Sequence, residues 1–514
     1  MKVVTAEELI DIDKKTSKKI PSILLMEHAA RDIFHLLLKR HKKLLSKKTV
    51  YIFSSVGGNG GDGLAAARYL INNRCNVKIY IIGNIDRVNK DTYSNFNILK
   101  SMNIDINYLG SEEDVLHAVK NIEKKSVILD SLFGTGGSRP LEGIYKLLID
   151  SINGLDVLRI AIDIPSGLVS KINDNNNIYS CFKAHETYTV CFAKDIFFLY
   201  KTREYIGKLF IIKSIFPKSV LDSCKYKAKL IDCNEKININ RNAFSSKREQ
   251  GMLAIIAGSN DYIGAAVLAS KAAYRLGTGY IRLYVPSGIV KNIRDAVISS
   301  MPEIVIIGIG EENQKCFTEN DIEIVNDINK SDACIIGSGI GRDMQTEIFV
   351  NSILKQIKIP AVIDADALYL MFESTFKELK DNFILTPHIY EFEKLTQINH
   401  IEALNNPYQA LLKFRQKTNA SVILKDAVSF LMHNNDIYIN YNPKESMGKA
   451  GMGDVLAGFI GALLARKLNT LDASKAALII QSKSFNILSK KFGNDYIQPK
   501  DLSDISYKIL KRNK

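Results

Sequence analysis

The chain has 514 residues, of which 46 % are hydrophobic and 24 % are charged, which is typical of a folded globular protein and excludes a disordered or fibrous polymer. Its length also excludes a single small binding module and predicts at least two domains. Lys and Arg outnumber Asp and Glu by 69 to 55, a net charge of +14 that favours anionic ligands, although we interpret it first as a compositional bias.

From residue 49 onward, short apolar segments alternate with helical patterns. The apolar segments are TVYIFSSV, VKIYII, SVILD, LRIAID and TYTVCF. Segments that are apolar at nearly every position are typical of parallel strands covered by helices on both faces. Residues 1–215 are therefore predicted to form an α/β domain with an open sheet.

A polar stretch without a sustained apolar period, residues 216–240, is predicted to link this domain to a second one. The pattern then restarts with MLAIIAGS, the helix-like YIGAAVLASKAAYRL, the strand-like YIRLYVP, ACIIGSG, AVIDAD, FILTPH and SVILKD, and a final helical VLAGFIGALLA. Residues 241–514 are therefore predicted to form a second α/β domain. The two halves share no repeat, which indicates fusion of unrelated domains rather than duplication.

The glycine-rich segment VGGNGGDG, residues 56–63, is predicted to be a loop between a strand and a helix. Glycines let backbone amides approach a ligand, and a helix start offers unpaired N–H groups to an anion. The segment satisfies GxGxxG, and Asp86 follows it about 20 residues on. However, Asp62 would place a carboxylate against a pyrophosphate, so an ordinary dehydrogenase is the least favoured interpretation.

Two further segments, DSLFGTGGSRPLEG and DIPSGL, follow predicted strands. The carboxyl ends of parallel strands share one edge of a sheet, so polar groups from all three loops can converge there. These groups are Asn59, Asp62, Asp130, Arg139, Asp163 and Ser166. For any one loop, the alternative is that Gly and Asp are only turn residues.

The motifs MEHAA, NGGDGLAAARYL, DSLFGTG with RPLEG, and DIPSG resemble the epimerase domain of the bifunctional enzymes that repair hydrated NADH and NADPH. The resemblance covers about residues 1–215 and implies a Rossmann-like three-layer domain. It implies that substrate contacts Gly58, Asn59, Gly60, Gly61, Asp62, Gly134, Thr135, Gly136, Gly137, Ser138, Arg139, Pro140 and Asp163. It also implies potassium bound by Asn59, Asp130 and Ser166, whose oxygens suit such an ion. Gly58 departs from the usual pattern, which has Asn there.

Epimerisation of a hydrated carbon requires hydroxide to leave and to return on the opposite face. We predict that Asp163 is catalytic and carries the proton, provided that burial raises its pKa.

The segment SMGKAGMGDVLAGFIGALLA, residues 446–465, is predicted to be a glycine-rich loop that leads into a helix N-terminus. Backbone amides there would stabilise a transferred phosphoryl group, and Asp454 could accept a proton from an attacking hydroxyl. The alternative is that Asp454 is only a favourable first-turn acid. No GxxxxGK[ST] motif occurs, so a P-loop nucleotidase is not indicated.

The set GSxxYxGA, GxGxG, TPHxxE and GxGDVLAG resembles the dehydratase domain of the same repair enzymes, a branch of the ribokinase-like superfamily. The resemblance covers about residues 241–510 and implies a ribokinase-like α/β/α domain that uses ADP or ATP with Mg²⁺. It implies that hydrated dinucleotide contacts Ala265, Gly341, His388 and Asp454, with Asp454 as the catalytic base. It implies that the nucleotide contacts Lys425, Asp426, Ala427, Val428, Ser429 and Gly453. The sequence departs from the family pattern at Tyr390, Asp426, Ala450 and Met452.

We therefore predict a bifunctional enzyme that epimerises R and S hydrates of NADH or NADPH and dehydrates the S form with ADP or ATP. The alternatives are a small-molecule kinase of the ribokinase type and a dinucleotide-binding protein without catalysis. Seven cysteines without a CxxC pair indicate a reducing compartment. No leader-like or membrane-spanning apolar segment occurs, so we expect a cytoplasmic homo-oligomer with no nucleic-acid or membrane partner.

Overall fold

The computed structural model of the chain describes residues 1–136, 140–168, 180–213, 215–239, 246, 248–442 and 448–511. The chain forms two compact units, Lys2–Lys227 and Ala228–Lys514, and Met1 belongs to the second. The division falls inside the predicted linker, 216–240, which carries α7 (Lys218–Ser223) and β10 (Ala228–Leu230). The predicted domain limits, 1–215 and 241–514, stay predictions.

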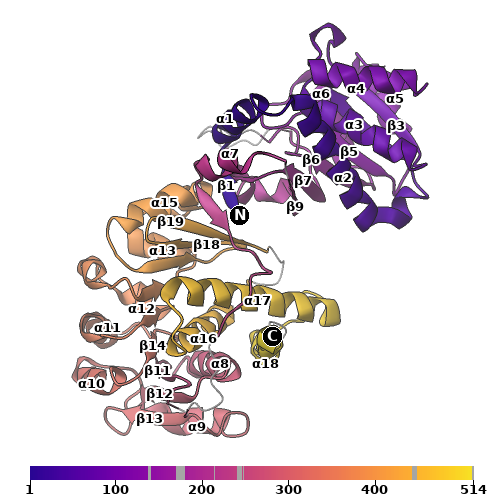
Figure 1. The fold of residues 1–514 in the computed structure, drawn as a ribbon. Coiled ribbons are helices and arrows are strands. Elements are labelled where there is room, and N and C mark those ends of the chain that lie inside the picture. The colour runs from indigo at the N-terminus through magenta and orange to yellow at the C-terminus, as the bar shows by residue number, and fades with distance from the viewer. Residues whose placement is uncertain are drawn as a thin grey trace. The chain divides into compact units, whose positions relative to one another are not determined.

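The first unit contains a seven-stranded, fully parallel sheet with the order β4-β3-β2-β5-β6-β7-β9 (Figure 1). These strands are β2 (Val50–Ser55), β3 (Val77–Ile82), β4 (Ile106–Leu109), β5 (Val127–Ser131), β6 (Leu158–Ile162), β7 (Glu186–Val190) and β9 (Lys208–Ile212). Each predicted apolar segment forms one of them because such strands are buried on both faces. The short strands β1 (Lys2–Val4) and β8 (Ala193–Lys194) pair separately.

Helices cover both faces of this sheet and form two apolar cores. One core contains residues of α2 (Ser22–Leu45), α3 (Gly58–Asn72) and α4 (Lys90–Ser101). The other contains residues of α5 (Glu112–Lys120) and α6 (Gly143–Asn153). The three-layer α/β prediction is confirmed. A helix before residue 22, α1 (Ala6–Ser17), was not predicted.

The second unit contains a larger sheet with the order β13-β12-β11-β14-β15-β16-β17-β18-β19-β10. Its strands are β11 (Met252–Ile256), β12 (Tyr280–Pro286), β13 (Val305–Ile309), β14 (Ala333–Ile336), β15 (Ala361–Ile363), β16 (Phe383–Leu385), β17 (Ser421–Leu424), β18 (Val428–His433) and β19 (Asp436–Tyr441). The strands from β13 to β17 are parallel, whereas β17, β18 and β19 are antiparallel. The antiparallel part was not predicted.

Helices lie on both sides of the second sheet, which confirms the α/β/α prediction. Figure 1 shows α8 (Ile263–Arg275), α16 (Met452–Ala465) and α17 (Thr470–Phe492) on one side of the strands, and α11 (Met344–Gln356) and α12 (Asp366–Leu370) on the other. The remaining helices of this unit are α9 (Val290–Val297), α10 (Val325–Ile328), α13 (Ile389–Thr396), α14 (His400–Asn405), α15 (Pro407–Arg415) and α18 (Pro499–Lys511). Within the described part of the chain, no helix is both long and apolar enough to cross a membrane.

Helix α8 buries a face of small residues, Ala266, Ala269, Ala272 and Ala273, which allows α16 to pack very close to it. A Cβ atom on Gly458 would lie 2.4 Å from the carbonyl oxygen of Ala269, a distance that close packing does not permit. The large apolar side chains of α16 are buried: Val455, Leu456, Phe459, Ile460, Leu463 and Leu464. This packing holds the N-terminus of α16, and with it Asp454, in a defined place.

Candidate functional site

The glycine-rich segment of the first unit forms the start of α3, not a loop as we predicted. The helix begins at Gly58, and Gly57 is its N-cap. A Cβ atom on Gly60 would lie 1.9 Å from the carbonyl oxygen of Ser55, and one on Gly61 would lie 2.5 Å from Cε of Met26. The segment therefore needs glycine because α3 starts directly against β2 and α2.

We expect Gly60→Ala to lower the free energy of unfolding of the first unit by about 1–3 kcal/mol, because its new methyl group overlaps backbone. Urea unfolding of the purified protein measures this loss. Gly58→Ala is the matched control, since nothing lies within 4 Å of a Cβ atom there. Equal stability of the two variants would contradict the expected packing.

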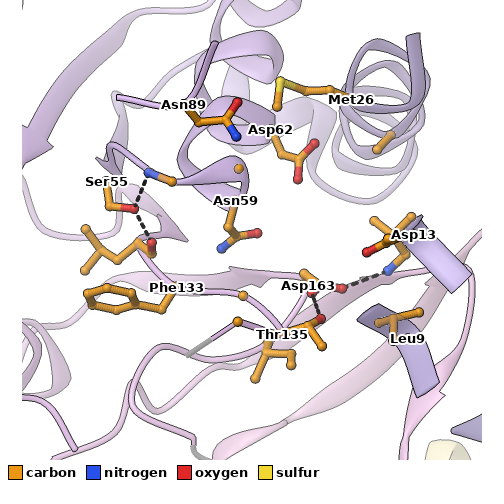
Figure 2. Close-up of a pocket in the computed structure, with 18 of the residues that line it drawn as sticks. Leu9, Asp13, Met26, Ser55, Asn59, Asp62, Asn89, Phe133, Thr135 and Asp163 are labelled. Atoms are coloured by element: carbon orange, nitrogen blue, oxygen red, sulfur yellow. Dashed lines mark hydrogen bonds between the residues drawn. The ribbon is translucent and has the colours of Figure 1, made fainter. Parts of the chain in front are cut away.

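A cavity of about 970 Å³ lies at the carboxyl edge of the first sheet (Figure 2). Eight predicted substrate residues line it: Gly58, Asn59, Asp62, Gly134, Thr135, Gly136, Pro140 and Asp163. Gly60 and Gly61 are buried and are not part of the lining. Gly137, Ser138 and Arg139 lie outside the described residues. The opposite wall, which the sequence did not predict, comes from α1 and α2 with Leu9, Asp13 and Met26.

Asp163 follows β6 in a left-handed backbone conformation, with φ of 68°. Its carboxylate accepts a 2.9 Å hydrogen bond from Oγ1 of Thr135 and pairs with the ammonium group of Lys194, whose side chain is 1 % exposed. Burial opposes ionisation of Asp163, but Lys194 outweighs burial and lowers the pKa of this carboxyl group. The condition set for proton transfer by Asp163, a pKa raised by burial, is therefore not met, because the sequence does not show that Lys194 is its partner.

Two other carboxyl groups on the cavity wall hold their protons more tightly than usual. Burial, together with the charge of Asp163, raises the pKa of Asp62 well above its ordinary value. The same two causes raise the pKa of Asp13 to about 6. The cavity therefore combines the ionised carboxylate of Asp163 with Asp62, whose raised pKa favours the protonated form, and Asp13, which titrates near pH 6.

Asn59, Asp130 and Ser166, the three predicted potassium ligands, have the chemistry of a cation site. Asp130 is buried and accepts hydrogen bonds from the backbone N–H and Oγ of Ser166 at 2.8 and 2.6 Å. Burial raises the pKa of Asp130 to about 6 in spite of these hydrogen bonds, so a positive charge beside it would stabilise its ionised form. The side-chain amide of Asn59 is buried and has no hydrogen-bond partner among the described residues. A monovalent cation would neutralise Asp130 and give the amide oxygen of Asn59 a partner.

In the second unit, the predicted site residues lie at the carboxyl edge of the sheet. Gly341 follows β14, His388 follows β16 and Lys425 follows β17. Gly451 caps α16 with φ of 91°, and Asp454 lies in the first turn of this helix. Ala265 is in the first turn of α8, the helix after β11. The topology thus brings segments that are far apart in the sequence to one edge.

Asp454 and Lys425 belong to one charged cluster with Asp364. The Nζ atom of Lys425 donates to Oδ1 of Asp364 at 2.8 Å, and a Cβ atom on Gly453 would lie only 3.1 Å from this Nζ atom. Burial and the charge of Asp364 raise the pKa of Asp454 to about 7, although Lys425 partly counteracts them. A carboxyl group with this pKa can accept and release a proton near neutral pH.

His388 also has a structural role as the N-cap of α13. Its Nδ1 atom accepts hydrogen bonds from the backbone N–H groups of Tyr390 and Glu391, and its Nε2 atom lies 3.1 Å from Oε1 of Glu391. The imidazole is half-exposed, so one face remains open to a ligand. Tyr390 itself is 61 % exposed.

The turn between β17 and β18 contains the remaining predicted nucleotide contacts. Asp426 and Ala427 are exposed, whereas Val428 is 0 % exposed. Val428 can therefore offer only its backbone to a nucleotide. Oγ of Ser429 donates to the carbonyl oxygen of Asp426 at 3.3 Å.

Comparison with known proteins identifies both units. A family described as NAD(P)H-hydrate dehydratase matches residues 253–508, and one described as YjeF-related protein N-terminus matches residues 22–196. Bifunctional NAD(P)H-hydrate repair enzymes align with almost the whole chain. The enzyme from Thermofilum pendens is 27 % identical over 99 % of this chain and 96 % of its own length, and the enzyme from Methanocaldococcus jannaschii is 28 % identical over 99 % and 94 %. This chain belongs to the bifunctional NAD(P)H-hydrate repair enzymes.

Solved structures also resemble part of this chain in fold. An ADP/ATP-dependent NAD(P)H-hydrate dehydratase from Bacillus subtilis, co-crystallised with ATP and Mg²⁺, is 20 % identical, with a TM-score of 0.48, and the match covers 56 % of this chain and 99 % of that one. A ribokinase-like superfamily protein from Enterococcus faecalis is 22 % identical, with a TM-score of 0.48, and the match covers 56 % and 96 %.

Three charged residues of the repair enzyme's sites were not predicted from the sequence. They are Asp13 on α1, Lys194 beside Asp163 and Asp364 beside Lys425. A partial signal exists for Asp364, which ends the apolar segment AVID in the way that Asp130 ends SVILD. No comparable signal marks Lys194, because lysine occurs throughout the chain and the local sequence does not show that this lysine lies beside Asp163.

Proposed function

We propose that the first domain interconverts the R and S hydrates of NADH or NADPH in its cavity and that the second domain dehydrates the S form at the Asp454 edge. The observation that carries the proposal is the placement of Asp454 in the first turn of α16, beside Lys425 and Asp364. This arrangement joins a base that is active near neutral pH to a helix start that attracts phosphate.

In the dehydratase, Asp454 takes the proton of the ring hydroxyl, and the hydroxyl oxygen attacks the terminal phosphorus of ADP or ATP. The bond from that phosphorus to the bridging oxygen breaks, and the shortened nucleotide leaves. The N–H groups at the start of α16 and the ammonium of Lys425 stabilise the charge on the phosphoryl group. The ring nitrogen's lone pair then expels phosphate, and loss of a ring proton regenerates NADH or NADPH.

The substrate ring would lie near Ala265, Gly341 and His388, and the nucleotide near Gly453 and the turn 425–429. Mg²⁺ bound with the nucleotide would neutralise phosphate charge. The charges of Asp364 and Asp366 both raise the pKa of Asp454. Their carboxylates are the hard oxygen ligands that Mg²⁺ prefers.

The dehydratase rate should rise with pH, because Asp454 acts as a base only when it is ionised. With its pKa at about 7, we expect kcat to rise about tenfold between pH 6 and pH 8 and then to level off. Steady-state kinetics at saturating hydrate and nucleotide measure this profile. A flat profile across neutral pH would exclude Asp454 as the base.

In the conversion of the R to the S hydrate, the ionised carboxylate of Asp163 is suited to accept a proton. It would take the proton from the water that returns to the ring, while the backbone at the start of α3 and Gly134–Pro140 hold the dinucleotide. Potassium bound by Asn59, Asp130 and Ser166 would supply positive charge that holds the substrate's anionic groups. The orphaned amide of Asn59 and the buried Asp130 support this assignment.

A spectrophotometric assay with a mixture of R and S hydrates of NADH, ADP or ATP, and magnesium tests both activities. Complete return of the NADH absorbance supports both activities, and conversion of half the mixture supports only the dehydratase. Accumulation of a phosphorylated product without NADH would indicate a small-molecule kinase, and binding without turnover would indicate a non-catalytic protein. Assembly into a homo-oligomer and a cytoplasmic location stay predictions of the sequence.

A further inference from the structure

Helix α1 contributes one charged group to a cavity wall that is otherwise mostly apolar. Leu9, Ile10 and Asp13 of this helix line the cavity, and Leu9 and Asp13 lie one helical turn apart on the same face (Figure 2). The match to the YjeF-related family begins at residue 22, whereas the alignments with the repair enzymes extend over 99 % of the chain. Neither match assigns a role to α1.

The other acidic residues of α1 have partners on the outside of the domain. Asp11 pairs with Lys15 at 2.5 Å, and Glu8 accepts a hydrogen bond from the backbone N–H of Lys225 at 2.7 Å. Among the described residues, Asp13 has no hydrogen bond or ion pair that would give its carboxyl group a structural role. Its exposed surface faces the cavity, where the surrounding protein still excludes much of the bulk water.

The charges around Asp13 keep both of its protonation states accessible. Asp163 favours the protonated form and Lys194 favours the ionised form, and with burial the pKa of Asp13 becomes about 6. The other titratable groups on the cavity wall are His28, Asp62, Asp91, Glu142 and Lys213. Asp62 is enclosed more deeply, and its pKa is raised well above the ordinary value, so it is suited to donate a fixed hydrogen bond rather than to exchange a proton.

We propose that Asp13 is a further catalytic residue of the epimerase and acts as the acid that protonates the departing hydroxyl group. This inference rests on the epimerase function proposed above. The Asp13 proton passes to the ring hydroxyl as its C–O bond breaks, and the bonding electrons leave with oxygen as water. The ring nitrogen's lone pair forms a C=N bond and leaves a cationic ring.

Water then adds to the opposite face of the ring, and the carboxylate of Asp163 accepts the proton that this water loses. The C=N electrons return to nitrogen, so the ring is again neutral and hydrated. Asp13 regains a proton from solvent as Asp163 releases one, so protons and charge balance over the cycle. Figure 2 shows Asp13 and Asp163 on different elements of the cavity wall, so each carboxyl group reaches the cavity from its own segment of the chain.

Asp13→Asn in the full-length protein tests the proposal. The rate of S-hydrate formation from R-enriched hydrated NADH, followed by chromatography, should fall at least about 100-fold, with KM within about twofold of the original value. Asp11→Asn on the outer face of α1 is the matched control and should retain full activity. A rate for Asp13→Asn within about threefold of the rate of the unmodified protein would overturn the proposal.

The pH profile of the unmodified protein provides a second test that does not depend on how the variant folds. An acid must be protonated to act, so epimerase kcat should fall about tenfold per pH unit once the pH rises well above about 6. A rate that stays constant up to about pH 8 would overturn the proposal. If the unmodified protein does not interconvert the hydrates at all, the proposed epimerase function fails. If the unmodified protein is active and Asp13→Asn is equally active, only the role of Asp13 fails.

Discussion

Replacing Asp454 by Asn should lower the dehydratase kcat by about 10²–10⁴-fold, because the variant keeps the shape of the site but cannot accept the hydroxyl proton. Formation of NADH from the S hydrate with ADP or ATP measures this loss. Asp472→Asn is the matched control, since Asp472 is also a first-turn acid, in the next helix, α17. Activity of Asp454→Asn equal to that of the control would show that Asp454 is only a helix-stabilising acid.

The thermal stability of Asp454→Asn also distinguishes a catalytic base from a helix-stabilising acid at this position. The pKa of Asp454 is raised to about 7, so the folded state binds this proton more tightly than the unfolded state. The resulting stabilisation is present below about pH 4 and is lost as the pH rises towards 7. At pH 8 the buried, ionised carboxylate of Asp454 lowers the free energy of unfolding, so Asp454→Asn should unfold at a higher temperature than the unmodified protein. A helix-stabilising acid would give the opposite sign.

Replacing Lys194 by Met should both inactivate the epimerase and destabilise the first domain. Asp163 would lose its buried counter-ion, and removal of one partner of such a pair costs about 3–5 kcal/mol. The pKa of Asp163 would rise, so the base would be protonated at neutral pH and the epimerase rate should fall about 100-fold or more. Thermal unfolding and the hydrate interconversion rate measure the two effects.

The double variant Lys194→Met with Asp163→Asn isolates the electrostatic cause. It leaves no unpaired buried charge, so it should regain most of the lost stability and remain inactive. Because the pKa of Asp163 is lowered in the folded state, the pair stabilises the domain above about pH 4, and this stabilisation disappears as the pH falls. A double variant as unstable as the single one would show that Lys194 acts by packing alone.

Local patterns in the chain predicted both sheets and most of the two sites. Buried parallel strands are apolar at nearly every position, so their segments and the polar residues that end them are visible without a structure. In each unit, the carboxyl edge of the sheet then brings such residues together. Asp130 and Asp163 lie at this edge in the first unit, and His388 and Asp454 lie at the edge of the second. Helix α1 was not predicted because its pattern is short and strongly charged. The antiparallel pairing of β18 and β19 was not predicted because no local pattern distinguishes it from parallel pairing.

The protonation states of the site carboxyl groups could not be predicted in this way. The pKa of Asp163 depends on Lys194, 31 residues away along the chain, and the pKa of Asp454 depends on Asp364 and Lys425 from two separate strands. Such contacts arise between segments that the fold brings together. Burial alone therefore predicted the wrong direction for Asp163.

The sequence by itself determined the kind of fold, the family and which loops carry the chemistry, because these depend on residue types at fixed local spacings. Only the tertiary structure decided which carboxyl groups are ionised, which helix closes the epimerase cavity and where Asp13 lies. The physical reason is that charge and desolvation act through space, so the acidity of a carboxyl group is set by neighbours in the fold that are often far away in the chain.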